Sequence, residues 1–268
     1  MKSDCRKAVI VAAGRGRRLG GKTDEVPKCM VRVGGRPILH WQLRALAAAG
    51  IDQVTIVRGY LGQRIDAGEI PVRFVENPDW ESNNILASLM YAASELAGGF
   101  YFSYCDIVYA PAAVARLAAA SRQPGAEASL VVDRGWATTY AGRSLHPVSE
   151  AELALVESGG GPSRIRQVGK QAVAAAQAAG EFIGLAHFSE SGAAKLARIW
   201  RDALAGPGLD APFGRAKTLR QAYLTDALNA MIASGDNLAP VFIDGGWREI
   251  DTEQDLAAAE RAVAEWAG

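Results

Sequence analysis

The stretch that decides the fold spans residues 8–28 and reads AVIVAAGRGRRLGGKTDEVPK. Its first six residues form a continuous apolar run that ends at a glycine, which is typical of a strand buried on both faces. Glycines after such a strand let backbone N–H groups approach an anion, and Arg15, Arg17, Arg18 and Lys28 add positive charge. The spacing is neither GxxxxGK[ST] nor GxGxxG, because Leu19 stands at the third glycine position. The string alone therefore indicates either a phosphate-binding loop of another kind or a solvated glycine-rich turn.

Outside this stretch, short apolar runs alternate with Ala/Leu-rich helical segments. We predict strands over 53–57, 72–75, 100–105, 129–132, 182–188, 241–243 and 249–251, and helices over 37–49, 85–96, 111–120, 192–204, 222–233 and 253–266. Residues 133–165 are polar and predict loops and short strands. Such alternation indicates parallel βαβ units, in which ligands bind outside the carboxyl ends of the strands. That rule points to residues 14–19, 59–60, 77–84 and Asp106.

Composition excludes several classes of function. The 268 residues carry 29 basic and 29 acidic side chains. The chain therefore lacks the excess of positive charge that general binding to nucleic acid requires. Three cysteines without a CxxC pair predict neither a disulfide framework nor a zinc knuckle, and they fit a reducing, cytoplasmic compartment. No uncharged apolar run approaches the ~18 residues of a membrane span. Three histidines without metal-ligand spacing argue against histidine-based chemistry.

Two aspartates that are far apart in the sequence are candidates for a metal site. Asp106 and Asp251 each end or follow a predicted strand. Two carboxylates that converge at strand ends could hold a Mg²⁺ ion that bridges phosphates. The alternative for each aspartate alone is a turn or helix-capping residue. Downstream, Thr252 and Asp255 have the spacing of a capping box at the start of the last helix.

Six segments, read together, carry a resemblance to a known family. They are AVIVAAGRGRRL (8–19), VPKCMVRVGGRPILHWQLRALAAAGI (26–51), VTIVRGYLGQRI (54–65), NPDWESNNILASLMYA (77–92), CDIVY (105–109) and GGWREIDTEQDL (245–256). The chain resembles the sugar-phosphate nucleotidyltransferases nearly end to end, and most of all their phosphocholine cytidylyltransferase branch. The resemblance implies an α/β, Rossmann-like GT-A-type fold with a mixed, mostly parallel central sheet flanked by helices. It also implies one domain over 1–268, with a nucleotide-binding half (1–125) and an acceptor-binding half (126–268).

The resemblance assigns roles to individual residues. The implied nucleotide-binding residues are Ala12, Ala13, Gly14, Arg15, Gly16, Lys28, Asn84, Ser88 and Asp106. The implied catalytic residues are Lys28, Arg18, Asp106 and Asp251, and the last two would bind Mg²⁺. Asn84 could instead cap a helix, and Ser88 could be a plain surface residue. Lys170 would reach the acceptor phosphate, or it is a solvated lysine. One departure is Tyr104, which replaces the first acid of the DxD-like pair of related enzymes.

The chemistry of the acceptor half predicts a pocket for an ammonium group. Trp136, Tyr223 and Trp247 fall in this half together with Asp133, Asp226 and Glu249, and aromatic faces with nearby carboxylates suit a cation. The alternative is that these aromatics belong to the core. Residues 138–152 do not align with phosphocholine enzymes, and we interpret Arg143 and His146 there as surface-loop residues rather than acceptor contacts. The acceptor stays open among phosphocholine, aminoalkylphosphonates and phosphorylated polyols.

These residues together predict a CTP-dependent cytidylyltransferase. An acceptor phosphate or phosphonate oxygen attacks the α-phosphorus of CTP, and pyrophosphate leaves. Because that oxygen is already ionised, positioning and charge neutralisation suffice and no strong base is needed. The alternatives are a sugar- or cyclitol-phosphate uridylyl- or guanylyltransferase and a non-catalytic nucleotide-binding protein. An NAD-dependent oxidoreductase is disfavoured by the missing GxGxxG. The sequence leaves a homodimer open.

Overall fold

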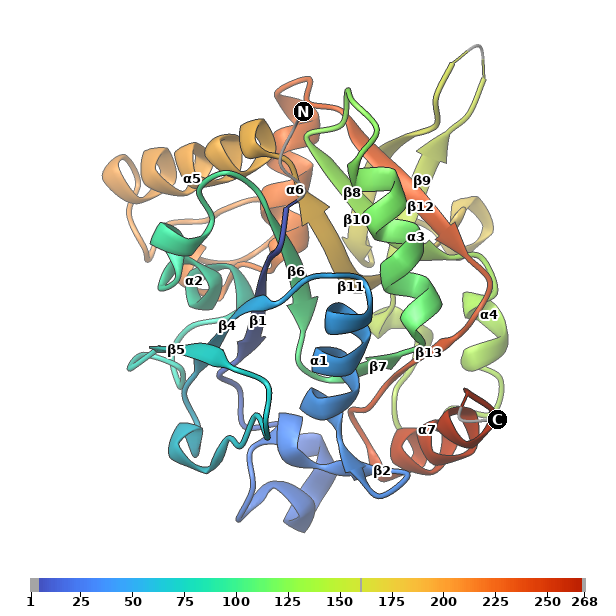
Figure 1. The fold of residues 1–268 in the computed structure, drawn as a ribbon. Helices are drawn as coiled ribbons and strands as arrows, with labels where there is room; N and C mark the ends of the chain where they lie inside the picture. Colours follow the sequence, from blue (N-terminus) through green and yellow to red (C-terminus); the bar gives the residue numbers. More distant parts are fainter. Residues whose placement is uncertain (1–4, 160, 267–268) are drawn as a thin grey trace.

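The computed structural model describes residues 5–159 and 161–266, and Figure 1 shows their arrangement. Its strands are β1 (Lys7–Ala12), β2 (Arg32–Val33), β3 (Arg36–Pro37), β4 (Gln53–Arg58), β5 (Val72–Glu76), β6 (Phe100–Tyr104), β7 (Ile107–Tyr109), β8 (Ala128–Asp133), β9 (Glu152–Glu157), β10 (Arg164–Lys170), β11 (Gly180–Phe188), β12 (Leu238–Ile243) and β13 (Trp247–Glu249). Its α-helices are α1 (Ile38–Ala48), α2 (Ile85–Met90), α3 (Pro111–Ser121), α4 (Trp136–Thr139), α5 (Glu190–Ala205), α6 (Leu224–Ala233) and α7 (Glu253–Trp266).

One central sheet runs through both halves of the sequence. Its main order is β10-β9-β11-β6-β1-β4-β5, and β8 pairs with both β11 and β12. Strands β6, β1, β4 and β5 pair in parallel, whereas β11 pairs antiparallel with β6, β8 and β9. The predicted α/β class with a mixed central sheet is confirmed. Its parallel core places the carboxyl ends of β1, β4 and β6 at one edge of the sheet.

Helices cover both faces of this sheet, which explains the continuous apolar run in β1. Side chains along a strand alternate between the two faces. Val9 and Val11 pack in the core that includes residues of α2, α5 and α6, whereas Ile10 packs in the core that includes residues of α1 and α3. Both faces of β1 are therefore buried, as the sequence predicts.

The C-terminal helix is held where the sequence predicts it. Thr252 Oγ1 accepts a hydrogen bond from the backbone N–H of Asp255, and Asp255 Oδ2 accepts one from the N–H of Thr252, which confirms the capping box. Ala259 and Val263 of α7 pack against Leu19 from the loop after β1. The C-terminal helix thus packs beside the segment that follows the glycine-rich loop, and Figure 1 shows α7 next to β2.

Some element boundaries differ from the predicted ones. The strand predicted over 249–251 is β13, which ends at Glu249 and pairs antiparallel with β7. The helix predicted over 85–96 is the shorter α2, followed by a 3₁₀ turn over Ala93–Glu95. The polar segment 133–165 contains β9 and the start of β10, which form an antiparallel pair at one edge of the sheet. Among the described helices, none is both long and apolar enough to cross a membrane.

Candidate active site

The glycine-rich loop leaves β1 at the carboxyl edge of the sheet and is packed against Lys28. Gly16 has a φ of 70°, in the left-handed region that favours glycine. A Cβ atom at this position would lie 2.8 Å from Cδ of Lys28. Glycine is therefore required here for two reasons, since it permits the turn and leaves room for the lysine stem. Downstream, residues 17–23 form a 3₁₀ segment that carries Arg17 and Arg18.

Lys28 joins three segments that are far apart in the sequence. Its side chain is buried, and Nζ lies 2.8 Å from Oδ2 of Asp106 and donates a hydrogen bond to Oδ1 of Asp251. Burial alone lowers the pKa of Lys28, but the attraction of Asp106 and Asp251 outweighs it and holds this pKa above its ordinary value. Burial likewise favours neutral Asp251, yet Lys28 and Arg18 lower its pKa. Lys28 and Asp251 are therefore both charged at neutral pH.

Two arginines of the loop occupy different positions. Arg18 donates a hydrogen bond of 2.6 Å to Oδ2 of Asp251 and lies 3.7 Å from Glu150. Arg15 instead donates to Asp24 at 3.1 Å, and its guanidinium lies over the ring of Tyr60. Arg18 thus belongs to the Lys28 cluster, whereas Arg15 lies at the rim of the loop.

A cavity of about 370 Å³ opens beside this cluster. We call it the catalytic cavity. Its charged lining residues are Arg17, Arg18, Lys28, Lys170, Asp106, Glu150, Glu152, Glu181, Glu249 and Asp251. Oδ1 of Asp106 is buried and has no hydrogen-bond partner among the described residues. A polar atom in that position is free to bind a ligand inside the cavity.

Two buried glutamates form the inner wall of the catalytic cavity. Burial raises the pKa of Glu152 and that of Glu181 to about 7 each. The Tyr104 hydroxyl donates to Glu152 at 3.0 Å, and the Tyr140 hydroxyl donates to Oε1 of Glu181 at 2.7 Å. Oε2 of Glu181 is buried without a partner among the described residues. The inner wall therefore offers an unsatisfied carboxylate oxygen to a ligand.

Gly184 makes room for the ring of Tyr104. It lies in β11 with a φ of 83°, and a Cβ there would lie 2.2 Å from the Tyr104 ring. The regular register between β8 and β11 also shifts between Phe182 and Ala186. The irregular part of β11 thus accommodates the ring of Tyr104, which lines the catalytic cavity.

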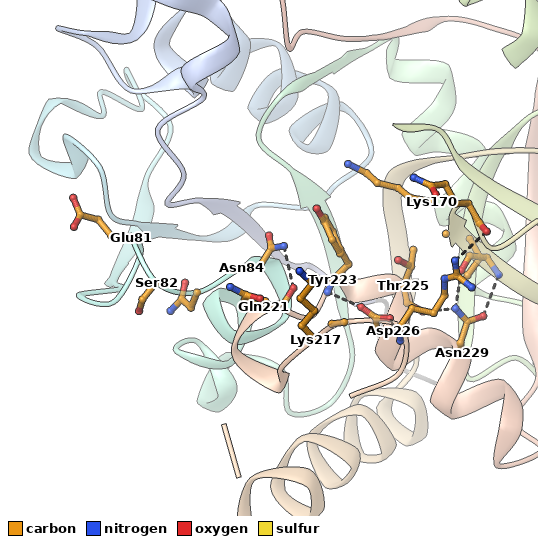
Figure 2. Close-up of a pocket in the computed structure, with 16 residues that line it drawn as sticks. Glu81, Ser82, Asn84, Lys170, Lys217, Gln221, Tyr223, Thr225, Asp226 and Asn229 are labelled. Carbon is orange, nitrogen blue, oxygen red and sulfur yellow. Dashed lines mark hydrogen bonds between the residues drawn. The ribbon is translucent and has the colours of Figure 1, made fainter. Parts of the chain in front are cut away.

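Lys170 and Tyr223 stand at the outer side of the catalytic cavity. Nζ of Lys170 lies 3.0 Å from Glu150 and 5.0 Å from the centroid of the Tyr223 ring. Burial alone lowers the pKa of Lys170, but Tyr223, Glu152 and Glu150 together raise it above its ordinary value. Lys170 and Tyr223 also line a second, larger hollow of about 790 Å³, shown in Figure 2, which we call the outer groove.

Comparison with known proteins gives this arrangement a family. Residues 8–211 match the family model described as the MobA-like NTP transferase domain. The chain belongs to this family. It is therefore a nucleotidyltransferase with its glycine-rich loop, Lys28, Asp106 and Asp251 gathered at one edge of the sheet.

Individual relatives match over nearly their whole length. The nucleotidyltransferase is 30% identical over 263 residues to CTP:phosphoglutamine cytidylyltransferase of Campylobacter jejuni. The match covers 93% of this chain and 97% of the relative. It is 28% identical over 258 residues to 2-aminoethylphosphonate cytidylyltransferase of Lancefieldella rimae, with 94% and 90% covered. Among solved structures, CTP:phosphocholine cytidylyltransferase from Streptococcus pneumoniae superposes with a TM-score of 0.70 at 20% identity, over 96% of this chain and 98% of that one. The predicted GT-A-like nucleotidyltransferase fold is confirmed.

Two of the residues that the resemblance assigns to nucleotide binding lie in different surroundings. Asn84 caps α2, since its Oδ1 accepts from the N–H of Ile85, and it also lines the catalytic cavity. Ser88 is buried and forms hydrogen bonds with Asn77 and Asn83. It lines neither the catalytic cavity nor the outer groove. The nucleotidyltransferase thus places Asn84 where a nucleotide could reach it, and Ser88 inside a polar cluster.

The ammonium pocket predicted from aromatics and acids needs correction. Asp133 is fully buried and accepts hydrogen bonds from the N–H groups of Gly135 and Gly245 and from Nε1 of Trp247. Trp136 packs against Tyr140 in a small apolar cluster. Neither Asp133 nor Trp136 lines the two hollows, because both are used to hold strand ends and α4 in place.

The other predicted acceptor residues do face the two hollows. Glu249 lines the catalytic cavity with Lys170 and Tyr223, and burial raises the pKa of Glu249 well above its ordinary value. Asp226 lines the outer groove, but its carboxylate accepts from the backbone N–H groups of Tyr223 and Arg215. Lys170, Tyr223 and Glu249 therefore remain candidates for acceptor contacts. The carboxylate of Asp226 instead stabilises the backbone around it.

Two residues that we interpreted as surface residues are buried behind the cluster. His146 is fully buried, with Nδ1 3.3 Å from Asp251 and Nε2 3.4 Å from Glu249. Arg143 donates to Asp255 at 2.6 Å and to Glu249 at 3.2 Å. His146, Glu249 and Asp251 bring potential metal-ligand atoms within 4.8 Å of one another. No spacing in the sequence signals this, because Arg143 and Glu249 are 106 residues apart.

Proposed function

We propose that the enzyme transfers the cytidylyl group of CTP to a small acceptor that carries a phosphate or phosphonate. An acceptor oxygen forms a bond to the α-phosphorus, the bond from that phosphorus to its bridging oxygen breaks, and pyrophosphate leaves with the electron pair. The placement of Lys28 between Asp106 and Asp251, at the carboxyl edge of the parallel strands, carries this proposal. Two relatives matched over nearly their whole length bear cytidylyltransferase names, which supports CTP as the donor.

The cations around the cavity suit two phosphoryl groups held close together. Lys28, Arg17 and Arg18 stand by the glycine-rich loop and would neutralise the triphosphate. Lys170 lines the same cavity, near Arg18, since both lie beside Oε2 of Glu150, and it would hold the acceptor phosphoryl group. Fixing both groups in one cavity lowers the barrier by orientation, and the ionised acceptor oxygen needs no base.

We also propose Mg²⁺ as the metal of this site. Carboxylate oxygens are the ligands that Mg²⁺ prefers, and Asp106 retains a buried oxygen without a partner. Asp106 and Asp251 would hold the ion. When bound, Mg²⁺ would supply charge neutralisation at the phosphate oxygens.

The inner wall favours an acceptor with an ammonium group. Oε2 of Glu181 has no hydrogen-bond partner among the described residues, and the charge of Glu152 is close enough to raise the pKa of Glu181. Tyr104 and Phe182 add aromatic surface to the same cavity. An ammonium group would satisfy the oxygen and would gain from the carboxylates and rings. We therefore move the ammonium site from Asp133 and Trp136 to the Glu152–Glu181 wall.

A matrix of pyrophosphate release tests this function. CTP, UTP, GTP and ATP are each combined with 2-aminoethylphosphonate, phosphocholine, inositol 1-phosphate and glucose 1-phosphate in the presence of MgCl₂. We expect the highest kcat/KM for CTP with an amine-bearing acceptor. A higher value for UTP or GTP with a sugar phosphate would overturn the assignment, and omission of Mg²⁺ with added EDTA tests the metal.

The free cysteines bear on the cellular location of the enzyme. We infer a cytoplasmic enzyme because Cys5, Cys29 and Cys105 are free thiols, which suits a reducing compartment. A homodimer stays a prediction, and light scattering on the purified protein tests it.

A further inference from the structure

The outer groove adjoins the catalytic cavity and is roughly twice its volume. Asn84, Lys170 and Tyr223 line both hollows, so a ligand held at Lys170 can extend from one into the other. Figure 2 shows Lys170 toward one end of the groove, Glu81 at the other, and Lys217 and Tyr223 between them. The groove therefore lies where the part of an acceptor beyond its phosphoryl group would extend.

Two cations of the outer groove are exposed and lack acidic partners. Among the described residues, neither Arg215 nor Lys217 forms an ion pair, and Nη2 of Arg215 donates only to the backbone oxygen of Gln171. This differs from Lys170, which is paired with Glu150. The groove thus presents positive charge that no side chain neutralises directly.

A fixed turn presents these two cations to the groove. Gly214 has a φ of 57°, and a Cβ there would lie 2.8 Å from Oδ1 of Asp226. The backbones of Phe213 and Ala216 exchange two hydrogen bonds across the turn. The same Asp226 oxygen accepts from the N–H of Arg215, so its buried carboxylate holds the turn rather than facing a ligand.

The charge of the lining indicates a singly charged anion. Lys170 is paired with Glu150 and is assigned to the acceptor phosphoryl group, which leaves Arg215 and Lys217 as the groove's cations for a further anion. The two acids of the lining, Glu81 and Asp226, disfavour a second, doubly charged phosphate, so a singly charged carboxylate fits better. A guanidinium and an ammonium together also bind a carboxylate through charge-assisted hydrogen bonds.

We propose that the outer groove binds a carboxylate of the acceptor through Arg215 and Lys217. The acceptor is then a phosphoryl or phosphonate compound that carries both an ammonium group and a carboxylate, as an amino acid does. This rests on the proposed function, since it assigns the acceptor phosphoryl group to Lys170. It also predicts poor use of phosphocholine, which has no carboxylate.

Two phosphonates that differ only in the carboxylate test the proposal. These are 2-amino-4-phosphonobutanoate and 3-aminopropylphosphonate, each used with CTP and MgCl₂. We expect kcat/KM to be about 10-fold higher for the carboxylate compound, the size of one charge-assisted contact. In Arg215→Ala and Lys217→Ala, the ratio of the two kcat/KM values should fall toward one. Arg201→Ala, an exposed cation on α5, serves as the matched control and should keep the wild-type ratio.

Binding measurements separate this proposal from the proposed function. Calorimetric titration of the intact protein with each phosphonate shows whether the carboxylate compound binds more tightly and whether Arg215→Ala removes that advantage. If binding shows the preference and no nucleotide is transferred, the proposed reaction fails while the groove assignment stands. Equal affinities for the two phosphonates in the wild-type protein, or a ratio that both alanine variants leave unchanged, would overturn the groove assignment.

Discussion

The catalytic cavity and the outer groove share part of their lining, but their charged groups are arranged in opposite ways. In the catalytic cavity, Lys28 is buried and forms ion pairs with both Asp106 and Asp251. In the outer groove, Arg215 and Lys217 are exposed, and among the described residues neither is ion-paired. Buried charges must be paired to be tolerated, whereas exposed charges can await a ligand. The first region is therefore organised before substrate arrives, and the second gains its partner on binding.

The largest expected effect comes from breaking the organised region. Asp106→Ala removes the buried free oxygen and one partner of Lys28, so we expect kcat to fall by about 10³-fold or more. Arg15→Ala, at the loop rim, is the comparison and should cost less than about 10-fold, because exposed ion pairs contribute little. Pyrophosphate release measures both. Near-wild-type turnover in folded Asp106→Ala, checked by circular dichroism, would remove Asp106 from the mechanism.

The same contrast explains what the sequence could predict. Asp106 directly follows β6 of the parallel core, and Lys28 belongs to the loop segment that leaves β1, so both come to the carboxyl edge of the sheet. Asp251 is a candidate because it ends a predicted strand, and the family resemblance assigns it the metal role. The acceptor side is built by loops instead. Asp133 and Trp136 have side chains that suit an ammonium group, but both are used inside the fold. The carboxylate of Asp133 accepts hydrogen bonds from two backbone N–H groups beside the end of β8. The burial of His146 depends on contacts with the C-terminal segment that no local pattern encodes.

A second prediction tests the structural reading of Asp133. Asp133→Ala would leave two backbone N–H groups and the indole N–H of Trp247 without their acceptor. Buried donors without partners cost about 1–3 kcal/mol each, so we expect unfolding to become easier by about 3 kcal/mol. Urea denaturation followed by tryptophan fluorescence measures this. The ratio of kcat/KM for 2-aminoethylphosphonate over ethylphosphonate should stay unchanged, whereas a lost ratio at wild-type stability would restore Asp133 to the acceptor pocket.

The smallest expected effect concerns the titration of the inner wall. Burial raises the pKa of Glu181 to about 7, while the Tyr140 hydroxyl and Arg143 lower it and Glu152 and Asp133 raise it further. Below pH 7 the carboxyl is protonated and attracts an ammonium group less. The ratio of KM for ethylphosphonate to KM for 2-aminoethylphosphonate should therefore change more in favour of 2-aminoethylphosphonate, between about pH 6 and about pH 8, in the wild-type enzyme than in Glu181→Gln.

The two phosphonates ionise differently, because the ammonium group lowers the second phosphonate pKa of 2-aminoethylphosphonate. This substrate titration is the same for every enzyme variant, so the difference in slope between the wild-type enzyme and Glu181→Gln reports on the protein. We expect a change of up to about 10-fold, the limit for a group that titrates by one unit of charge across this range. Glu152 also has a pKa of about 7, so Glu181→Gln should reduce the slope without abolishing it. Glu76→Gln, an acid on the exposed end of β5, should leave it intact. Equal slopes in the wild-type enzyme and Glu181→Gln would place the ammonium group away from Glu181 and would return its unpaired oxygen to a hydroxyl-bearing acceptor.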